Sequence, residues 1–196
     1  MEFLYRNKIL NYIIIPKIIN CNPMKTLNYL FLVLSFISVT GCKKDGNALN
    51  NPAVESYVRL LKSNQYESSK LPHFTDEHIP ALLKYRDEKQ LITKFPRNLI
   101  SSMYSGECKL GMYVLWTIEA IRSGSISSSK TDMQQFPSQN AILKLRDANS
   151  LTLTFDDVSH DIAAKAYYDW WENNKNKNFD DFKDVDPLKD TNYRWH

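Results

Sequence analysis

One carboxylate stands alone inside an apolar segment, a setting that suits acid–base chemistry. Glu119 is the single charged residue of the run Leu110–Ile121. Burial raises the pKa of a carboxyl group, as a general acid requires. An ion pair with Arg122, three residues further on, would instead give Glu119 a structural role. We expect the ion pair, assign no catalytic residue and keep Glu119 as a candidate binding residue.

Aromatic residues gather towards the C-terminal end of the sequence and suggest a second chemistry, the stacking of aromatic rings on sugars. The cluster comprises Tyr167, Tyr168, Trp170, Trp171, Phe179, Phe182, Tyr193 and Trp195. Adjacent residues cannot share one helix face, so Tyr167 and Trp171 are candidate binding residues for a glycan. The alternative is that these aromatic rings pack in the core, which we favour for most of them.

Metal and nucleotide motifs do not fit the sequence. An EF-hand that began at Asp184 would place Leu188 at a ligand position, and Trp195 would replace the bidentate glutamate. The histidines lack the His-Glu-x-x-His spacing of zinc enzymes. The sequence also contains no P-loop and no Gly-x-Ser-x-Gly elbow. We therefore expect no metal and no cofactor.

A cysteine that follows an apolar run points to lipid attachment. Residues 39–42 have the sequence Val-Thr-Gly-Cys, which resembles the lipobox of bacterial lipoproteins. That resemblance implies cleavage before Cys42, which then carries diacylglycerol and an N-acyl chain. Cys108 would be the remaining free thiol, and we expect it to be a small buried apolar residue. A nucleophilic role would need a histidine within reach and an activating environment.

The segment before Cys42 has the order of a secretory signal. Met24-Lys25 supplies the charge, and an apolar stretch follows from Leu27 to Val39. A transmembrane helix needs roughly 20 predominantly apolar residues, so this stretch is too short to span a membrane. We interpret Met24 as the initiator, with residues 1–23 lying upstream of it; the alternative is a long basic leader. Either way, residues 1–41 form a leader and do not belong to the fold.

Length and charge limit the possible partners. Removing residues 1–41 leaves 155 residues, which suits one domain with its own core. The leader holds four of the 25 basic residues and one of the 22 acidic residues, which leaves 21 of each. A neutral domain has no basic face with which to neutralise phosphates, so we expect no binding to nucleic acid.

The first elements of the domain are predicted from capping and apolar spacing. Residues 42–51 are polar and form a tether. Asn51 is a good helix cap and Pro52 suits the first helical position, so we predict a helix over Pro52–Gln65. Thr75 caps a second predicted helix. Residues 91–100 contain a proline, and we expect them to be extended or irregular.

The remaining elements position the candidate site. Leu110–Ile121 is apolar nearly all round, so we predict that it is the central helix. We predict a weaker helix over Pro137–Asp147, and alternating apolar residues allow a short strand near Leu151–Phe155. A last helix, Phe155–Lys175, carries a predicted core stripe formed by Phe155, Val158, Ile162, Ala166 and Trp170. The sequence therefore predicts an all-α single domain, 52–196, with room for one short strand or extended segment.

Four stretches of the domain carry a family resemblance. Leu71–Thr75, Ile79–Tyr85, Leu115–Arg122 and Asn192–Trp195 resemble a family of small uncharacterised lipoproteins from Bacteroides-type bacteria. The resemblance covers most of the chain after the leader. It implies a location and no activity.

These observations predict an envelope protein held to a membrane by the lipid on Cys42. The anchor would place the domain at the outer membrane, on its periplasmic or its surface face. We expect a non-catalytic module that binds another envelope protein or a glycan. The alternative is a small hydrolase of cell wall or glycan that uses a carboxylate such as Glu119 with a second acid. Two carboxylates about 5–10 Å apart in a cleft would favour the hydrolase.

Overall fold

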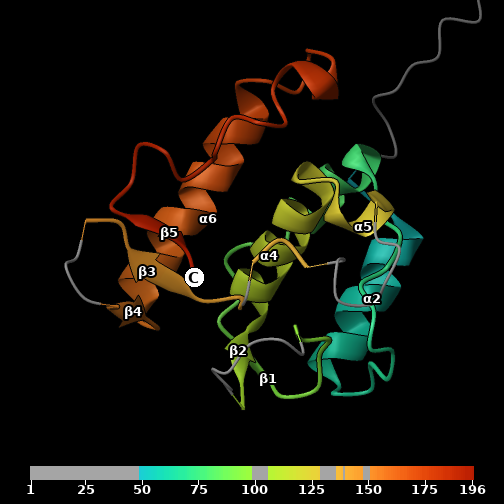
Figure 1. Cartoon of the computed structure of the whole chain (residues 1–196). Coiled ribbons are helices and arrows are strands. Elements are labelled where there is room, and N and C mark those ends of the chain that lie inside the picture. Colours follow the sequence, from blue (N-terminus) through green and yellow to red (C-terminus); the bar gives the residue numbers. More distant parts are fainter. Residues whose placement is uncertain (1–48, 99–105, 129–135, 139, 148–150) are drawn as a thin grey trace, which may run out of the picture. The chain divides into compact units, whose positions relative to one another are not determined.

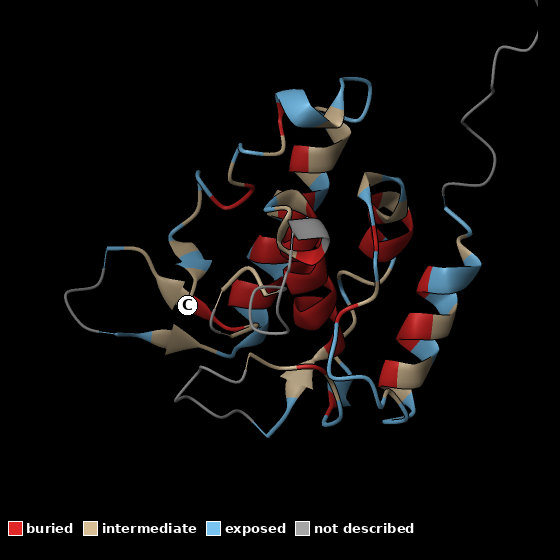
Figure 2. Cartoon of the chain, turned by 45° about the vertical axis from the view of Figure 1, so that its right-hand side comes forward, coloured by how far each residue is buried: buried red, intermediate tan, exposed pale blue. Residues whose placement is uncertain are grey.

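Helix α4 (Leu110–Arg122) is the element around which the described residues are arranged (Figure 1). The structure is a computed structural model that describes residues 49–98, 106–128, 136–138, 140–147 and 151–196. Every residue from Leu110 to Ile121 is buried, as the burial colouring of Figure 2 illustrates. The predicted central helix is therefore confirmed.

The chain divides into two units, Met1–Lys43 and Lys44–His196. All described residues belong to the second unit. The segment predicted to be a leader, residues 1–41, and Cys42, the predicted lipid-attachment site, lie outside the described residues. None of the described helices is both long enough and apolar enough to cross a membrane.

Helix α2 (Pro52–Lys62) confirms the first predicted helix and ends three residues earlier than predicted. The side-chain oxygen of Asn51 accepts hydrogen bonds from the backbone N–H groups of Ala53 and Val54, at 3.0 and 3.3 Å. The predicted second helix is a short 3-10 turn, η1 (Asp76–His78), that leads directly into α3 (Ile79–Leu83). Both α3 and the four-residue helix α5 (Ser125–Ser128) contact α4.

One glycine allows α4 to approach its neighbours closely. A Cβ atom on Gly111 would lie 2.3 Å from the carbonyl oxygen of Arg86 and 2.5 Å from Nε2 of His160. Both distances are too short for non-bonded atoms, so a side chain at this position would force the backbone or the imidazole to move. Gly111 therefore fixes where helix α6 (Asp157–Glu172), which carries His160, and the residues after α3 meet α4.

Helix α6 (Asp157–Glu172) begins at a capped end. The carboxylate of Asp156 accepts a hydrogen bond from the backbone N–H of Ser159 at 2.7 Å. The face that α6 turns to the core is formed by Ser159, His160, Ala163, Ala164, Tyr167 and Trp170. The predicted core stripe is therefore largely wrong: Phe155 and Val158 are 60% and 65% exposed, and Ile162 is 38% exposed.

Two small antiparallel sheets complete the described part of the domain. Strand β1 (Leu91–Ile92) pairs with β2 (Cys108–Lys109). In the second sheet, β3 (Leu143–Leu145) lies between β4 (Leu153–Thr154) and β5 (Tyr193–Trp195). Leu143 pairs with Thr154 on one side and with Trp195 on the other.

The predicted all-α class is therefore wrong, and the fold is an α+β mixture. The helix predicted over Pro137–Asp147 is replaced by β3, which pairs with the nearby β4 on one side and with β5, from the distant C-terminal end, on the other. The short strand expected near Leu151–Phe155 is present as β4. The C-terminal segment, which includes the 3-10 turn η3 (Phe179–Asp181), runs back along α6 before it forms β5 (Figure 1).

Candidate functional site

The carboxylate of Glu119, the first candidate, is hydrogen-bonded to other side chains of the protein. It is 9% exposed, and its two carboxylate oxygens accept hydrogen bonds from Nε and Nη2 of Arg122 at 2.9 and 2.6 Å. The hydroxyl of Tyr167 donates a third hydrogen bond to Glu119 at 2.6 Å. The expected ion pair with Arg122 is therefore present.

The same network reaches the C-terminal strand. Nε1 of Trp195, in β5, donates a hydrogen bond to the hydroxyl oxygen of Tyr167 at 2.8 Å. Arg122 also donates to the carbonyl oxygen of Lys183. Burial, together with the negative charge of Glu119, holds the pKa of Tyr167 well above its ordinary value. The network thus ties α4, α6 and the C-terminal segment together, and it leaves Glu119 no free oxygen for a substrate.

The two aromatic candidates lie in different surroundings. Tyr167 is fully buried, so its ring has no face open to a ligand. Trp171 is half-buried and packs against Trp170 and Phe182, with both ring centroids 6.1 Å away. Core packing, the interpretation favoured for most of this cluster, is what the structure shows for Tyr167 and Trp170.

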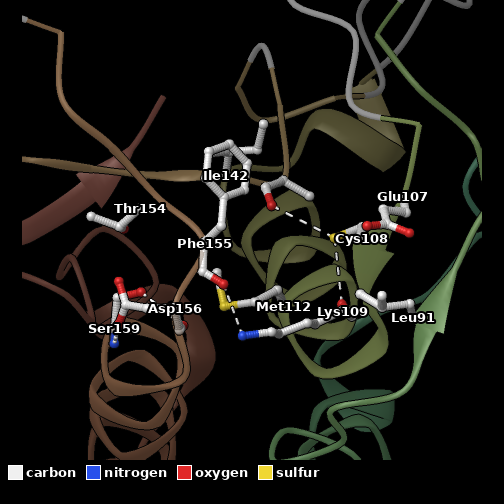
Figure 3. A pocket seen from close by; sticks show the side chains of 11 residues that line it. Leu91, Glu107, Cys108, Lys109, Met112, Ile142, Thr154, Phe155, Asp156 and Ser159 are labelled. Carbon is white, nitrogen blue, oxygen red and sulfur yellow. Dashed lines mark hydrogen bonds between the residues drawn. The ribbon is translucent and has the colours of Figure 1, made fainter.

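A cavity of about 350 Å³ lies at the N-terminal end of α4, where both sheets approach the first turn of α6 (Figure 3). In that view Cys108, Glu107 and Leu91 lie on one side, and Asp156 and Ser159 lie on the other. Apolar side chains supply most of the surface. They are Leu91, Met112, Ala141, Ile142 and Phe155. This volume falls in the range of small-ligand sites.

The polar groups of this cavity already have partners. The Lys109 ammonium donates to the carbonyl oxygen of Phe155 at 2.8 Å and forms an ion pair with Asp157. The hydroxyl of Ser159 donates to the backbone carbonyl oxygen of Asp156 at 3.1 Å. The hydrogen bond from the Ser159 N–H holds the pKa of Asp156 below its ordinary value, so this carboxyl is a poor general acid.

The thiol in the cavity is not activated. The Cys108 sulfur lies 3.4 and 3.7 Å from the carbonyl oxygens of Lys109 and Ala141. Burial raises the pKa of Cys108 to about 12, although Arg97 and Lys109 oppose the shift. The thiolate is the nucleophilic form, so a thiol with this pKa is inert at neutral pH. The expectation that Cys108 is a buried residue is met in part, because its side chain is half-buried at the edge of the cavity.

A second, more open groove of about 430 Å³ lies between α6 and the C-terminal segment. Ile162, Ala166 and Trp170 line it from α6, and Val185 and Pro187 line it from the facing segment. Within the described ranges, the indole nitrogen of Trp170 has no hydrogen-bond partner.

No group of histidine, cysteine, aspartate or glutamate side chains in the described ranges has the arrangement of a metal site. The cavity itself was not predicted from the sequence. Its residues come from four separate stretches of the sequence with no common spacing, so only the fold brings them together.

The fold and the site define a small α+β domain with an apolar cavity and, among the residues described, no assembled catalytic group. Residues 48–196 match the family model described as a domain of unknown function, DUF4943. Because the match spans most of the chain, the chain belongs to that family. No curated protein and no solved structure matches it.

Proposed function

We propose that this protein is a non-catalytic binding module of the bacterial cell envelope, held to the membrane by a lipid on Cys42. Two features support the anchor: residues 39–42 resemble a lipobox, and a short apolar stretch with a charged start precedes them. A Bacteroides-type lipoprotein would have this organisation. The ligand of the module is an apolar group carried by another envelope protein.

The cavity beside α6 is the observation that carries the binding proposal. It has apolar walls, and the polar side chains described around it are engaged within the protein, so a polar ligand would find few free groups. Leu91 and Phe155 are 48% and 60% exposed at this cavity. Burying such side chains against a partner yields about 25 cal/mol for each Å² of apolar surface removed from water.

The two alternatives, binding of a glycan and hydrolysis, have less support. A hydrolase needs a carboxylate that reaches its substrate. Both oxygens of Glu119 are engaged by Arg122 and Tyr167 instead. Tyr167 is buried and unable to stack on a sugar ring. The geometry therefore favours a binding module over a hydrolase.

Site-specific photo-crosslinking in intact cells tests the proposed module. A photoreactive phenylalanine analogue at Leu91 should crosslink to an envelope protein. The same analogue at Leu49, which is 60% exposed and does not line the cavity, is the matched control. Crosslinks of the same pattern from both positions, or none from Leu91, would contradict the proposal.

A cavity-filling variant tests the apolar nature of the site. The probe is N-phenyl-1-naphthylamine, a neutral apolar dye that fluoresces when it leaves water. The soluble domain should bind the dye, and Ala141→Phe should abolish binding by occupying the cavity. Ala53→Phe, on the exposed side of α2, should leave it unchanged. Equal dye binding by all three proteins would show that the cavity is not the site.

Labelled palmitate tests the anchor. The wild-type protein should incorporate the label and Cys42→Ala should not. Equal labelling of the two proteins would exclude Cys42 as the point of attachment.

A further inference from the structure

Strand β4 lies at one edge of its sheet, because β3 separates it from β5 (Figure 1). The backbone N–H of Leu145 donates to the carbonyl oxygen of Thr152 at 3.0 Å, and Leu143 pairs with Thr154. Backbone groups along an antiparallel strand point alternately towards its neighbour and away from it, so the N–H and C=O of Leu153 point away from β3. Neither group has a hydrogen-bond partner among the described residues.

The segment around Leu153 lacks features that protect most exposed edges. Charged side chains, prolines, bulges or a covering element normally prevent an edge strand from pairing with another chain. Residues 151–155 have the sequence Leu-Thr-Leu-Thr-Phe, without a charge, a proline or a glycine. Leu151 and Phe155 are 58% and 60% exposed. The short length of β4 limits pairing with another chain, but its unpaired backbone groups select an extended strand as the partner.

A second copy of residues 151–155 complements this edge. In an antiparallel pair with a two-fold axis at Leu153, this residue lies opposite itself and Leu151 lies opposite Phe155. The two Leu153 residues would exchange N–H···O=C hydrogen bonds, because both of their outward groups are unpaired. Leu151, Leu153 and Phe155 alternate with the threonines, so apolar side chains would meet apolar ones on one face. No like charges oppose each other within the paired segments, and the segment thus supplies its own complement.

We propose that two copies of this protein pair through β4, antiparallel about a two-fold axis at Leu153. The three strands of each copy then form one continuous sheet in the order β5-β3-β4-β4-β3-β5. The shared edge is short and offers few hydrogen bonds, so the dimer forms at high protein concentration and dissociates on dilution. Leu153 does not line the cavity, which makes this inference independent of the function proposed above.

Sedimentation of the soluble domain from about 10 µM to about 1 mM measures the association. The mean mass of the wild-type protein should rise towards that of a dimer. Leu153→Pro removes an N–H that the native sheet does not use, and proline is tolerated at such edge positions, so this variant should fold and stay monomeric. Leu153→Lys retains the N–H but places two ammonium groups opposite each other, and it should also stay monomeric. Leu49→Lys, which replaces an exposed leucine outside the sheet, should dimerise like the wild type.

Disulfide trapping tests the position of the two-fold axis. Opposite residues of a hydrogen-bonded antiparallel pair have Cα atoms about 5.5 Å apart, a distance that a disulfide spans. The protein for this test is the soluble domain that lacks Cys42 and carries Cys108→Ala. Mild oxidation of its Leu153→Cys variant should give covalent dimers, whereas Leu49→Cys should give at least 10-fold fewer.

A wild-type protein that stays monomeric at about 1 mM would overturn the proposal. So would a dimer that persists in Leu153→Lys, or equal trapping of the two cysteine variants. An unchanged melting temperature confirms that each variant is folded; if the proline variant does not fold, Leu153→Lys decides. Dye binding that Ala141→Phe abolishes, and that Leu153→Lys leaves unchanged, separates these results from a failure of the proposed function.

Discussion

Glu119 shows how the setting of a catalytic acid can serve a structural purpose. Its position within an apolar helix is what raises the question of catalysis, yet Arg122 lies one helical turn away and Tyr167 closes the network from α6. The pairing with Arg122 is local and was predictable from the spacing of three residues. The contributions of Tyr167 and Trp195 were not predictable, because they depend on how α6 and β5 pack.

The first prediction concerns this network. Glu119→Gln should lower the free energy of unfolding by about 3–5 kcal/mol, since it leaves the partly buried guanidinium of Arg122 without a counter-charge. Chemical denaturation of the soluble domain measures the loss. Lys165→Gln, which removes an exposed partner of Asp169, is the control and should change stability by no more than about 1 kcal/mol. If the Glu119→Gln variant is as stable as the wild type, the hydrogen-bond network does not contribute to stability.

His160 is the second residue whose protonation matters. Its Nε2 lies 2.7 Å from the carbonyl oxygen of Arg86 and must carry the proton, while its Nδ1 is buried without a described partner. Burial lowers the pKa of His160; the charges of Lys89 and Lys109 add to this shift, whereas the bond to Arg86 and the charge of Asp161 oppose it. The folded protein therefore favours the neutral imidazole.

A stability dependence on pH follows from that lowered pKa. An unfolded histidine titrates near pH 6.5, so below about this pH the unfolded chain binds a proton that the folded chain resists. The free energy of unfolding should be fully maintained above about pH 6.5 and should fall as the pH drops through the folded pKa. Urea denaturation between pH 5 and pH 8 measures this trend. In His160→Gln the decline should be shallower; an identical decline would assign it to other groups.

At the scale of elements, the main helices were predictable and most of the strands were not. α2 and α4 follow from caps and apolar spacing within one short window. The strands have only two or three residues each, too short for a clear alternating pattern, and β3 lies at the centre of its sheet only because the distant β5 pairs with it. In α6 the helix was predicted but most of its core face was assigned to the wrong residues, because the small Ala163 and Ala164 face the core while Val158 and Ile162 are exposed.

The third prediction tests the central place of α4. Leu115 and Ile118 are both fully buried, so truncating either to alanine should cost about 2–5 kcal/mol through lost burial and the cavity left behind. Thermal and chemical denaturation measure the loss. Leu49→Ala, at an exposed position, should stay within about 0.5 kcal/mol of wild type. Core variants as stable as this control would disagree with the burial of α4.

At the scale of the molecule, the order of the leader and the domain leads to the fourth prediction. Because charge and then apolar residues follow Met24, a gene that starts at Met24 should yield export and palmitate labelling equal to those of the full reading frame. Cell fractionation and labelling measure both. Replacement of Lys25 by glutamate is the control and should reduce export. Loss of export on removal of residues 1–23 would show that the upstream segment takes part.

The pairing of β3 with β5 has a consequence for the order in which this protein matures. As a ribosome releases the chain from its N-terminal end, β3 and β4 emerge well before Tyr193–Trp195, so the growing polypeptide carries β3 with one bare edge. The indole of Trp195, which completes the hydrogen bonds around Tyr167, is equally late. The completed three-stranded sheet and the full hydrogen-bond network around Tyr167 must therefore wait for this strand. In the exported protein that we propose, this delay leaves the sheet unformed, and an incompletely folded polypeptide passes more easily through a translocation channel.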